Sequence, residues 1–273
     1  MKQPEATQTG VATLHDLLGG ALPGRIHLLT GGPGSGKTSA CLHFLRAGML
    51  RGERTVLVTL DRPSDLQSHA RLLGHDLRAS VRDGRLTVLR YDARFTARIA
   101  AAASPATIVA ELQQLLTLAD LRQMLPGQAP LRIAVDPISP FLAEGVATGA
   151  AVATLVDWLE ETNATALLTW NGDPSARSDR RVERLVERAA VLLDFQRRGS
   201  GLFRADVVRA RHAMANTPPI DFEIRPGFGL AAVIGRPAEN HRESASVAPS
   251  VLLGPLTPLD DRLRSDADRT PPA

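Results

Sequence analysis

The sequence predicts an α/β protein: a mostly parallel sheet flanked by helices, with an antiparallel extension near the C-terminus. Two observations support this prediction. Up to about residue 189, short apolar runs alternate with stretches of helical periodicity, as expected for parallel strands joined by crossover helices. Beyond that point the apolar runs follow one another without helical stretches and are separated by Gly-containing turns, which is typical of antiparallel strands.

The first predicted unit is a strand, a glycine loop and a helix. Arg25–Thr30 resembles a short buried strand, and Thr38–Arg51 has apolar residues at helical spacing. Between them lies the sequence Gly31-Gly32-Pro33-Gly34-Ser35-Gly36-Lys37-Thr38, which fits the phosphate-binding pattern G-x-x-x-x-G-K-[ST]. Backbone N–H groups of such a loop surround the phosphates of a nucleotide, and the helix N-terminus adds a partial positive charge.

Lys37 supports this interpretation. The chain has 32 Lys and Arg residues, of which only Lys2 and Lys37 are lysines. A compact ammonium on a flexible stem fits inside a phosphate loop, whereas a planar guanidinium is a poor substitute. We therefore predict that Gly31 to Thr38, together with Ser39, bind the phosphates of a nucleotide.

The remaining elements are expected in the following order. After the loop unit come a strand over Thr55–Leu60 and an amphipathic helix over Asp65–Leu73, with Ser64 or Asp65 as its N-cap. Strands at Leu86–Leu89, Leu131–Val135 and Ala164–Thr169 alternate with helices at Ser104–Met124 and Ala151–Glu161. The antiparallel strands are Ala190–Phe195, Phe203–Arg211, Asp221–Ile224 and Leu230–Val233, with turns at Arg198–Gly201 and Pro226–Gly227.

Composition narrows the function classes. There is no run of about 18 apolar residues, the segment Met1–Gly10 lacks the apolar core of a signal peptide, and Cys41 is the single cysteine. These features indicate a cytoplasmic protein without a membrane span. A net charge of +3 does not establish a nucleic-acid partner. The histidine spacings do not predict a zinc site.

Polar residues at strand ends are candidate site residues. Magnesium prefers hard oxygen ligands, which Thr38 and Asp136 could supply, because Asp136 ends an apolar strand at the edge where open α/β sheets bind ligands. Asp61 follows the second strand and could orient water, and Asn171 could contact the γ-phosphate. For Asp61 and Asn171 the alternative is an ordinary polar residue in a strand-end loop.

The lead-in Gly10–Gly24 reads GVATLHDLLGGALPG and is followed by the phosphate loop; with the strand ending at Asp136 and the segment Asp221–Ile224, it resembles the KaiC-like ATPases of the RecA superfamily. The resemblance covers roughly residues 9 to 233 and implies a RecA-like fold that binds ATP with Mg²⁺. We place the ATPase domain at residues 9–236, a polar segment at 1–8 and a tail at 237–273. The tail is expected to be largely disordered, with Val251–Leu263 as a candidate docking segment.

The resemblance also implies an oligomeric ring, such as a hexamer, with nucleotide sites shared between subunits. A pair of glutamates would follow the second strand, but this chain has Asp61-Arg62, which puts the rate of hydrolysis in doubt. Arg209 and Arg211 match the basic residues that enter a neighbour's site, where they could stabilise transition-state charge. The alternative is a solvated strand face in an arginine-rich protein.

The segment Ala176–Arg181 matches a loop that often faces the channel of RecA-like rings. Its arginines could bind nucleic acid, but Asp179 and the nearby glutamates weaken that field, so nucleic acid is not the expected partner. The leading hypothesis is a slow ATPase that couples nucleotide state to assembly or to a protein partner. The alternatives are a scaffold that binds nucleotide without turnover and a recombinase-like DNA-dependent ATPase.

Overall fold

The computed structural model describes residues 23–90, 131–142, 148–172, 180–199, 201–210 and 218–233. Several sequence-based predictions concern other residues: the N-terminal segment, the helix Ser104–Met124, Arg211 and the tail from residue 237. These stay predictions. None of the helices in the described ranges is both long and apolar enough to cross a membrane.

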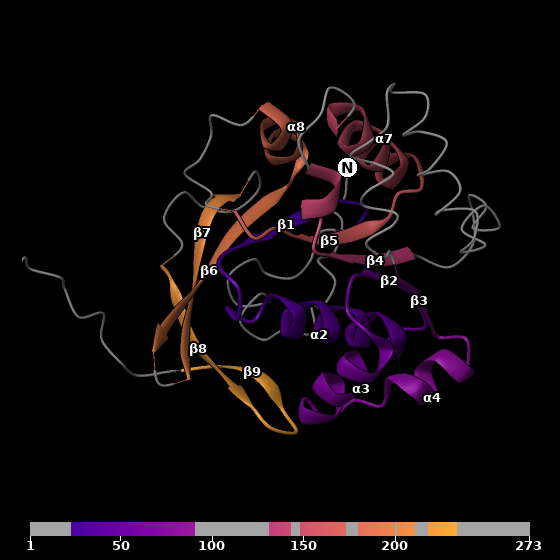
Figure 1. The fold of residues 1–273 in the computed structure, drawn as a ribbon, viewed down its shortest axis with the longest axis vertical. Coiled ribbons are helices and arrows are strands. Elements are labelled where there is room, and N and C mark those ends of the chain that lie inside the picture. The colour runs from indigo at the N-terminus through magenta and orange to yellow at the C-terminus, as the bar shows by residue number, and fades with distance from the viewer. Residues whose placement is uncertain are drawn as a thin grey trace, which may run out of the picture. The chain divides into compact units, whose positions relative to one another are not determined.

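A nine-stranded sheet in the order β3-β2-β4-β5-β1-β6-β7-β8-β9 organises the described residues (Figure 1). The first six strands in this order are mutually parallel, which confirms the predicted α/β class. They are β3 (Leu86–Arg90), β2 (Arg54–Thr59), β4 (Leu131–Asp136), β5 (Thr165–Thr169), β1 (Ile26–Thr30) and β6 (Val191–Gly199). Because these strands are parallel, the loops at their carboxyl ends lie along one edge of the sheet.

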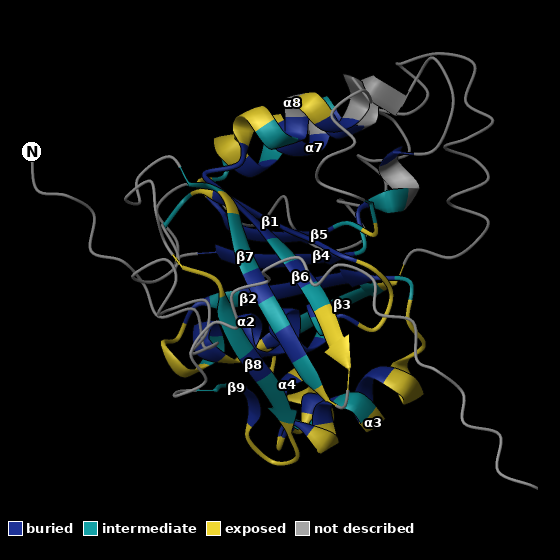
Figure 2. Ribbon diagram, turned by 90° about the vertical axis from the view of Figure 1, so that its left-hand side faces the viewer, coloured by how far each residue is buried: buried dark blue, intermediate teal, exposed yellow. Residues whose placement is uncertain are grey.

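Helices cover both faces of the sheet. On one face lie α2 (Lys37–Leu50), α3 (Pro63–Leu72) and α4 (Leu77–Arg82), and on the other lie α7 (Thr148–Glu161) and α8 (Arg180–Arg188). A short 3-10 turn, η2 (Ser139–Leu142), follows β4. The parallel strands β1, β2, β4 and β5 are buried over nearly their whole length, whereas β3 and the second half of β6 are partly exposed (Figure 2). Burial on both faces explains why the four buried strands appear in the sequence as continuous apolar runs.

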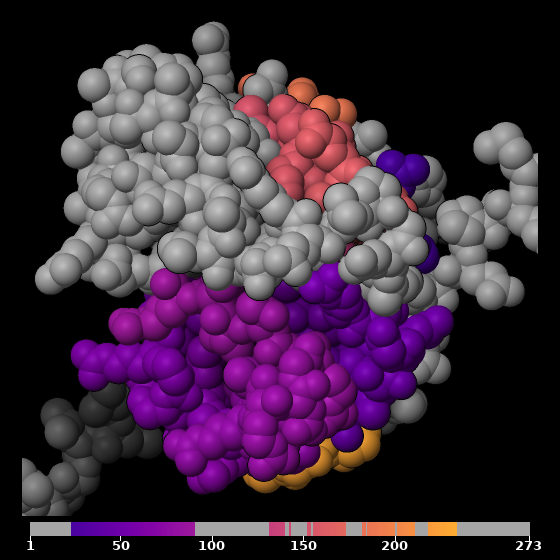
Figure 3. Space-filling model, turned by 90° about the vertical axis from the view of Figure 1, so that its right-hand side faces the viewer, coloured from indigo at the N-terminus to yellow at the C-terminus, as the bar shows by residue number. Residues whose placement is uncertain are grey.

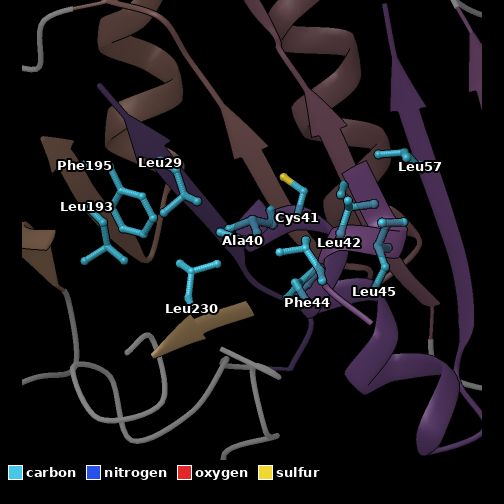
Figure 4. Close-up of a cluster of buried hydrophobic side chains, with 14 of the residues drawn as sticks. Leu29, Ala40, Cys41, Leu42, Phe44, Leu45, Leu57, Leu193, Phe195 and Leu230 are labelled. Carbon is cyan, nitrogen blue, oxygen red and sulfur yellow. The ribbon is translucent and has the colours of Figure 1, made fainter. Parts of the chain in front are cut away.

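The core beneath α2 is built from both parts of the sheet. Figure 4 shows Leu29, Leu57, Leu193 and Phe195 of the strands, Ala40, Cys41, Leu42, Phe44 and Leu45 of α2, and Leu230 of β9. Cys41 is fully buried, and this burial raises the pKa of its thiol. It is therefore a small apolar residue of the core.

The predicted antiparallel extension is present. β6 pairs with β7 (Leu202–Ala210), β7 with β8 (Ile220–Arg225) and β8 with β9 (Gly229–Ala232). The turn between β8 and β9 reaches the end of α3, where the N–H of Gly227 donates to the carbonyl of Leu72 at 2.6 Å. Figure 3 shows the side of the molecule that carries α3 and α4, with this hairpin along its lower edge. The extension thus closes over the same face as α2.

Two local predictions were wrong, and two helices, α4 and α8, were not predicted. Helix α3 begins at Pro63 and its N-cap is Arg62, not Ser64 or Asp65. Proline favours the first helical position and holds the residue before it extended. Arg180 and Arg181 begin helix α8 instead of lying in a channel-facing loop, since Val182 and Leu185 bury an apolar stripe against the sheet.

A buried ion pair fixes α2 on the sheet. Arg132 of β4 is fully buried and donates to both carboxylate oxygens of Glu53, from Nε at 2.6 Å and from Nη2 at 2.9 Å. Its Nη1 donates to the carbonyl of Phe44 at 3.0 Å, and its guanidinium lies 4.6 Å from the centre of the Phe44 ring. Gly48 lets the helix approach, because a Cβ there would lie 2.8 Å from Cδ of Arg132.

We predict that Arg132→Ala lowers the free energy of unfolding by about 3–5 kcal/mol, because it leaves the buried Glu53 carboxylate with only the 3.6 Å ion pair to the partly exposed Arg51. The matched control is Arg204→Ala, which removes the partly exposed pair between Arg204 and Asp221 and should cost at most about 1 kcal/mol. Denaturant unfolding of both variants measures the difference, and equal losses would contradict the role assigned to Arg132.

Candidate nucleotide-binding site

The glycine loop joins β1 to α2 at the carboxyl edge of the sheet, as its motif predicts. Its first residue, Gly31, has φ +131°, and a Cβ there would lie 2.1 Å from the carbonyl oxygen of Phe195 in β6. Gly36, with φ +95°, is the N-cap of α2. Both positions need glycine, since other residues rarely adopt such φ values. The backbone N–H groups at the start of α2 can therefore face an anion.

Lys37 lies inside the loop. Its Nζ donates to the carbonyls of Gly31 at 2.7 Å and Gly32 at 2.8 Å, and it lies 3.3 Å from Oγ of Ser35. Burial lowers the pKa of Lys37, and the charge of Asp136 opposes this shift. The ammonium is thus held at the loop by short contacts and balanced by a nearby carboxylate, which places a cation where a triphosphate would bind.

Asp136 ends β4 and is held by the neighbouring strand. The hydroxyl of Thr169, at the end of β5, donates to Oδ1 of Asp136 at 2.5 Å. Thr169 is fully buried and Asp136 is 7% exposed. The hydrogen bond orients the carboxylate and leaves Oδ2 for another partner. With the hydroxyl of Thr38, this carboxylate gives the hard oxygen donors that fit Mg²⁺.

One cavity of about 330 Å³ brings the predicted residues together. It is lined by Pro33, Gly34, Ser35, Gly36, Lys37, Thr38, Ser39, Asp61, His69, Asp136, Pro137, Asn171 and Ile224. Burial, followed by the charge of Asp136, raises the pKa of Asp61. Asp61 therefore holds a proton more readily than a free aspartate does. Arg62, the next residue, does not line the cavity.

Three residues of this cavity were not predicted from the sequence: Pro137, which follows Asp136, and also His69 and Ile224. His69 comes from α3, and its Nε2 lies 2.8 Å from Oγ of Ser39. Ile224 comes from β8, more than 180 residues from the loop in sequence, and its Cδ1 would lie 3.4 Å from a Cβ at Gly36. Neither His69 nor Ile224 belongs to a sequence motif. His69 could have been found only by noting that it lies two turns into the helix that follows Asp61.

A second cavity, of about 500 Å³, adjoins the other side of the loop. It is lined by Gly31, Gly32, Pro33, Ser35, Asn171, Gly172, Asp194, Phe195, Gln196 and Arg197. The carboxylate of Asp194 accepts from the hydroxyl of Thr30 at 3.0 Å and from the amide of Gln196 at 2.8 Å. Asn171 lines both cavities, so it lies between the phosphate loop and the end of β6.

Arg209 does not join the site of its own chain. It pairs in register with Leu192 near the start of β6, at the opposite edge of the sheet from the loop. Its Nη1 donates to the carbonyl of Val186 in α8 at 2.8 Å, and the side chain is half-buried. Arg211 lies outside the described residues, as do residues 173–179.

Comparison with known proteins gives consistent matches. A family model for the KaiC ATPase matches residues 7–234. A UPF0273 protein of Aeropyrum pernix is 31% identical over 169 residues, covering 60% of this chain and 67% of that protein. One of Pyrobaculum aerophilum is 28% identical over 228 residues, covering 80% and 79%. The circadian clock oscillator protein KaiC of Parathermosynechococcus lividus is 36% identical over 85 residues, covering 30% of this chain and 16% of that protein.

We predict that Thr169→Val weakens Mg²⁺-dependent nucleotide binding about tenfold, because losing a hydrogen bond that orients a metal ligand typically costs 10–100-fold in affinity. The matched control is Thr55→Val, since Thr55 is also buried and its hydroxyl donates to the carbonyl of Arg85 at the far end of the sheet. Magnesium titrations followed by calorimetry measure nucleotide affinity for both variants. Equal effects would show that the Asp136 contact has no special role.

Proposed function

The chain belongs to the KaiC ATPase family, and we propose that it binds ATP with Mg²⁺, hydrolyses ATP slowly and uses the nucleotide state to control its own assembly. The observation that carries this proposal is the cavity in which the phosphate loop, Thr38, Asp61, Asp136 and Asn171 meet. These residues come from four separate strand ends, and few activities other than phosphoryl chemistry require this combination of groups.

In this proposal the phosphates lie against the loop N–H groups and the Lys37 ammonium. Thr38 and Asp136 hold Mg²⁺, which supplies charge neutralisation at the phosphates. The Thr169 hydroxyl keeps Asp136 in the orientation that this role needs. Asn171 lines the same cavity, which supports its side-chain amide as the contact to the γ-phosphate.

Asp61 is the candidate for orienting the attacking water. It lines the cavity from the end of β2, and burial with the charge of Asp136 raises its pKa, which makes its carboxylate a better proton acceptor. Its neighbour Arg62 is exposed and cannot accept a proton. A single carboxylate beside a cation supports slow turnover, and it also supports a second candidate: a scaffold that responds to nucleotide without hydrolysing it.

The proposed assembly is supported by the positions of the phosphate loop and Arg209 at opposite edges of the sheet. The phosphate loop lies at one edge and Arg209 at the other, so Arg209 can reach a phosphate only in a neighbouring copy placed head to tail. The cavity beside Asp194 and Arg197 leaves the outer side of the loop open to such a neighbour. A heterologous contact of this kind closes into a ring or extends into a filament.

We predict that Lys37→Ala weakens binding of ATP with Mg²⁺ by about a hundredfold, since it removes the charge-assisted hydrogen bonds to the phosphates. The fold should remain, because Lys37 contacts the loop and not the apolar core. Calorimetry on the folded variant, with unfolding monitored separately, measures the effect. Unchanged affinity would remove the basis of the proposed function.

We predict that Asp61→Asn abolishes hydrolysis and that Arg62→Glu raises it, if the missing second carboxylate limits the reaction. Phosphate release measured with saturating ATP decides between the slow ATPase and the scaffold, and repeating it with single-stranded DNA tests the DNA-dependent alternative. A wild-type turnover above about 1 s⁻¹, the low end of usual enzyme rates, would contradict an impaired site.

We predict that ATP with Mg²⁺ gives a larger particle by light scattering than ADP does, because only contacts that differ between the two states can shift the equilibrium. Changing Arg209 and Arg211 together to Ala should reduce that mass while ATP binding by the monomer is retained. Arg225→Ala is the control, since Arg225 is exposed and pairs with Glu223 in its own strand. A wild-type protein that stays monomeric with saturating ATP would rule out shared sites.

A further inference from the structure

His69 is the titratable residue of the cavity that the proposed function leaves without a role. It lies on α3 and is half-buried, and the cavity that contains Lys37, Asp61 and Asp136 is the one it lines. Its Nε2 lies 2.8 Å from Oγ of Ser39. The imidazole therefore contacts the residue that follows the phosphate-binding motif.

Ser39 has an unusual hydrogen bond for a helical serine. In the interior of a helix the serine hydroxyl commonly donates to the carbonyl one turn earlier. Here the hydroxyl of Ser39, a residue that is 1% exposed, pairs with the side chain of His69. Ser39 lies in the first turn of α2, directly after Thr38, and it lines the same cavity as the phosphate loop.

The direction of this hydrogen bond decides what Ser39 can do. Burial lowers the pKa of His69, against the charges of Asp136 and Asp61, so the imidazole is neutral near pH 7 and carries one proton. If that proton is on Nδ1, Nε2 accepts from Ser39 and the hydroxyl proton is used up. If it is on Nε2, the imidazole donates to Ser39 and the hydroxyl can donate elsewhere.

We propose that His69 is a positioning residue for nucleotide phosphate: its Nε2–H donates to Ser39, so that the Ser39 hydroxyl donates to a phosphate oxygen. Phosphate oxygens only accept hydrogen bonds, so a bound phosphate favours this arrangement over the reverse one. The inference rests on the proposed nucleotide site and assigns His69 to the phosphates, not to the nucleoside. It also links α3, which follows Asp61, to the helix that carries the loop.

The test measures binding of ATP and of inorganic tripolyphosphate, each with Mg²⁺, to the full chain by calorimetry. His69→Leu should weaken both about tenfold, the usual size of one lost hydrogen bond to a charged group. His69→Gln should bind like the wild type, because its amide N–H can donate to Ser39. Ser68→Ala is the matched control on α3, since the Ser68 hydroxyl bonds only the Ser64 carbonyl in the described structure, and it should change neither affinity.

A double-mutant cycle separates positioning from a direct contact. If His69 acts through Ser39, His69→Leu should cost nothing further once Ser39→Ala is present. Two results would overturn the inference while leaving the proposed phosphate site intact. One is a loss of affinity for ATP but not for tripolyphosphate. The other is a double variant whose loss of affinity equals the product of the two single fold-losses. If His69→Leu does not fold, Ser39→Ala alone must weaken tripolyphosphate binding, and unchanged affinity overturns the inference. Wild-type protein that binds neither compound would instead overturn the proposed function itself.

Discussion

The packing of helix α2 against strand β4 is the contact on which the rest of the structure depends. Side chains at alternate positions of a strand share one face, so Arg132, Ala134 and Asp136 all face α2. Arg132 holds the middle of the helix through the Phe44 carbonyl and the connection after the helix through Glu53. Asp136 lies near the N-terminus of the helix, in the cavity that Lys37 also lines. A shift of α2 along β4 would therefore move the phosphate loop away from the carboxylate that balances its lysine.

Charge in the site is controlled by burial and by close partners together. A buried ammonium or carboxylate is costly unless it is paired and hydrogen-bonded. Lys37 meets this requirement through loop carbonyls and the nearby Asp136, and Asp136 through the hydroxyl of Thr169. Asp61 and His69 are less buried than Lys37 and Asp136. The pKa of Asp61 is raised and the pKa of His69 is lowered, and each shift favours the neutral form of the side chain. The most buried charges of the cavity, those of Lys37 and Asp136, are thus the ones with close hydrogen-bond partners.

The two edges of the sheet carry different chemistry. Every predicted site residue in the described ranges, except Arg209, lies at the carboxyl edge, where parallel strands present their loops. The antiparallel strands β7 to β9 reverse the chain direction, so Arg209 is carried to the amino edge while Ile224 is brought back to the loop. This separation of the two edges is the basis of the proposed head-to-tail assembly, in which each copy would offer a different edge to the next.

The sequence by itself determined the fold class, the family, the phosphate loop and the strand-end acids, because each of these is written in residues close together: a glycine-lysine motif, apolar runs, and aspartates just after them. Helix α8 and the N-cap of α3 were missed or misplaced, since short amphipathic segments and capping residues carry weak local signals. The tertiary structure alone decided which strands are neighbours, that Glu53 is the partner of Arg132, and that His69 and Ile224 reach the loop. Those relations join residues far apart in the chain, and they depend on how helices and strands pack, which periodicity along one segment does not encode.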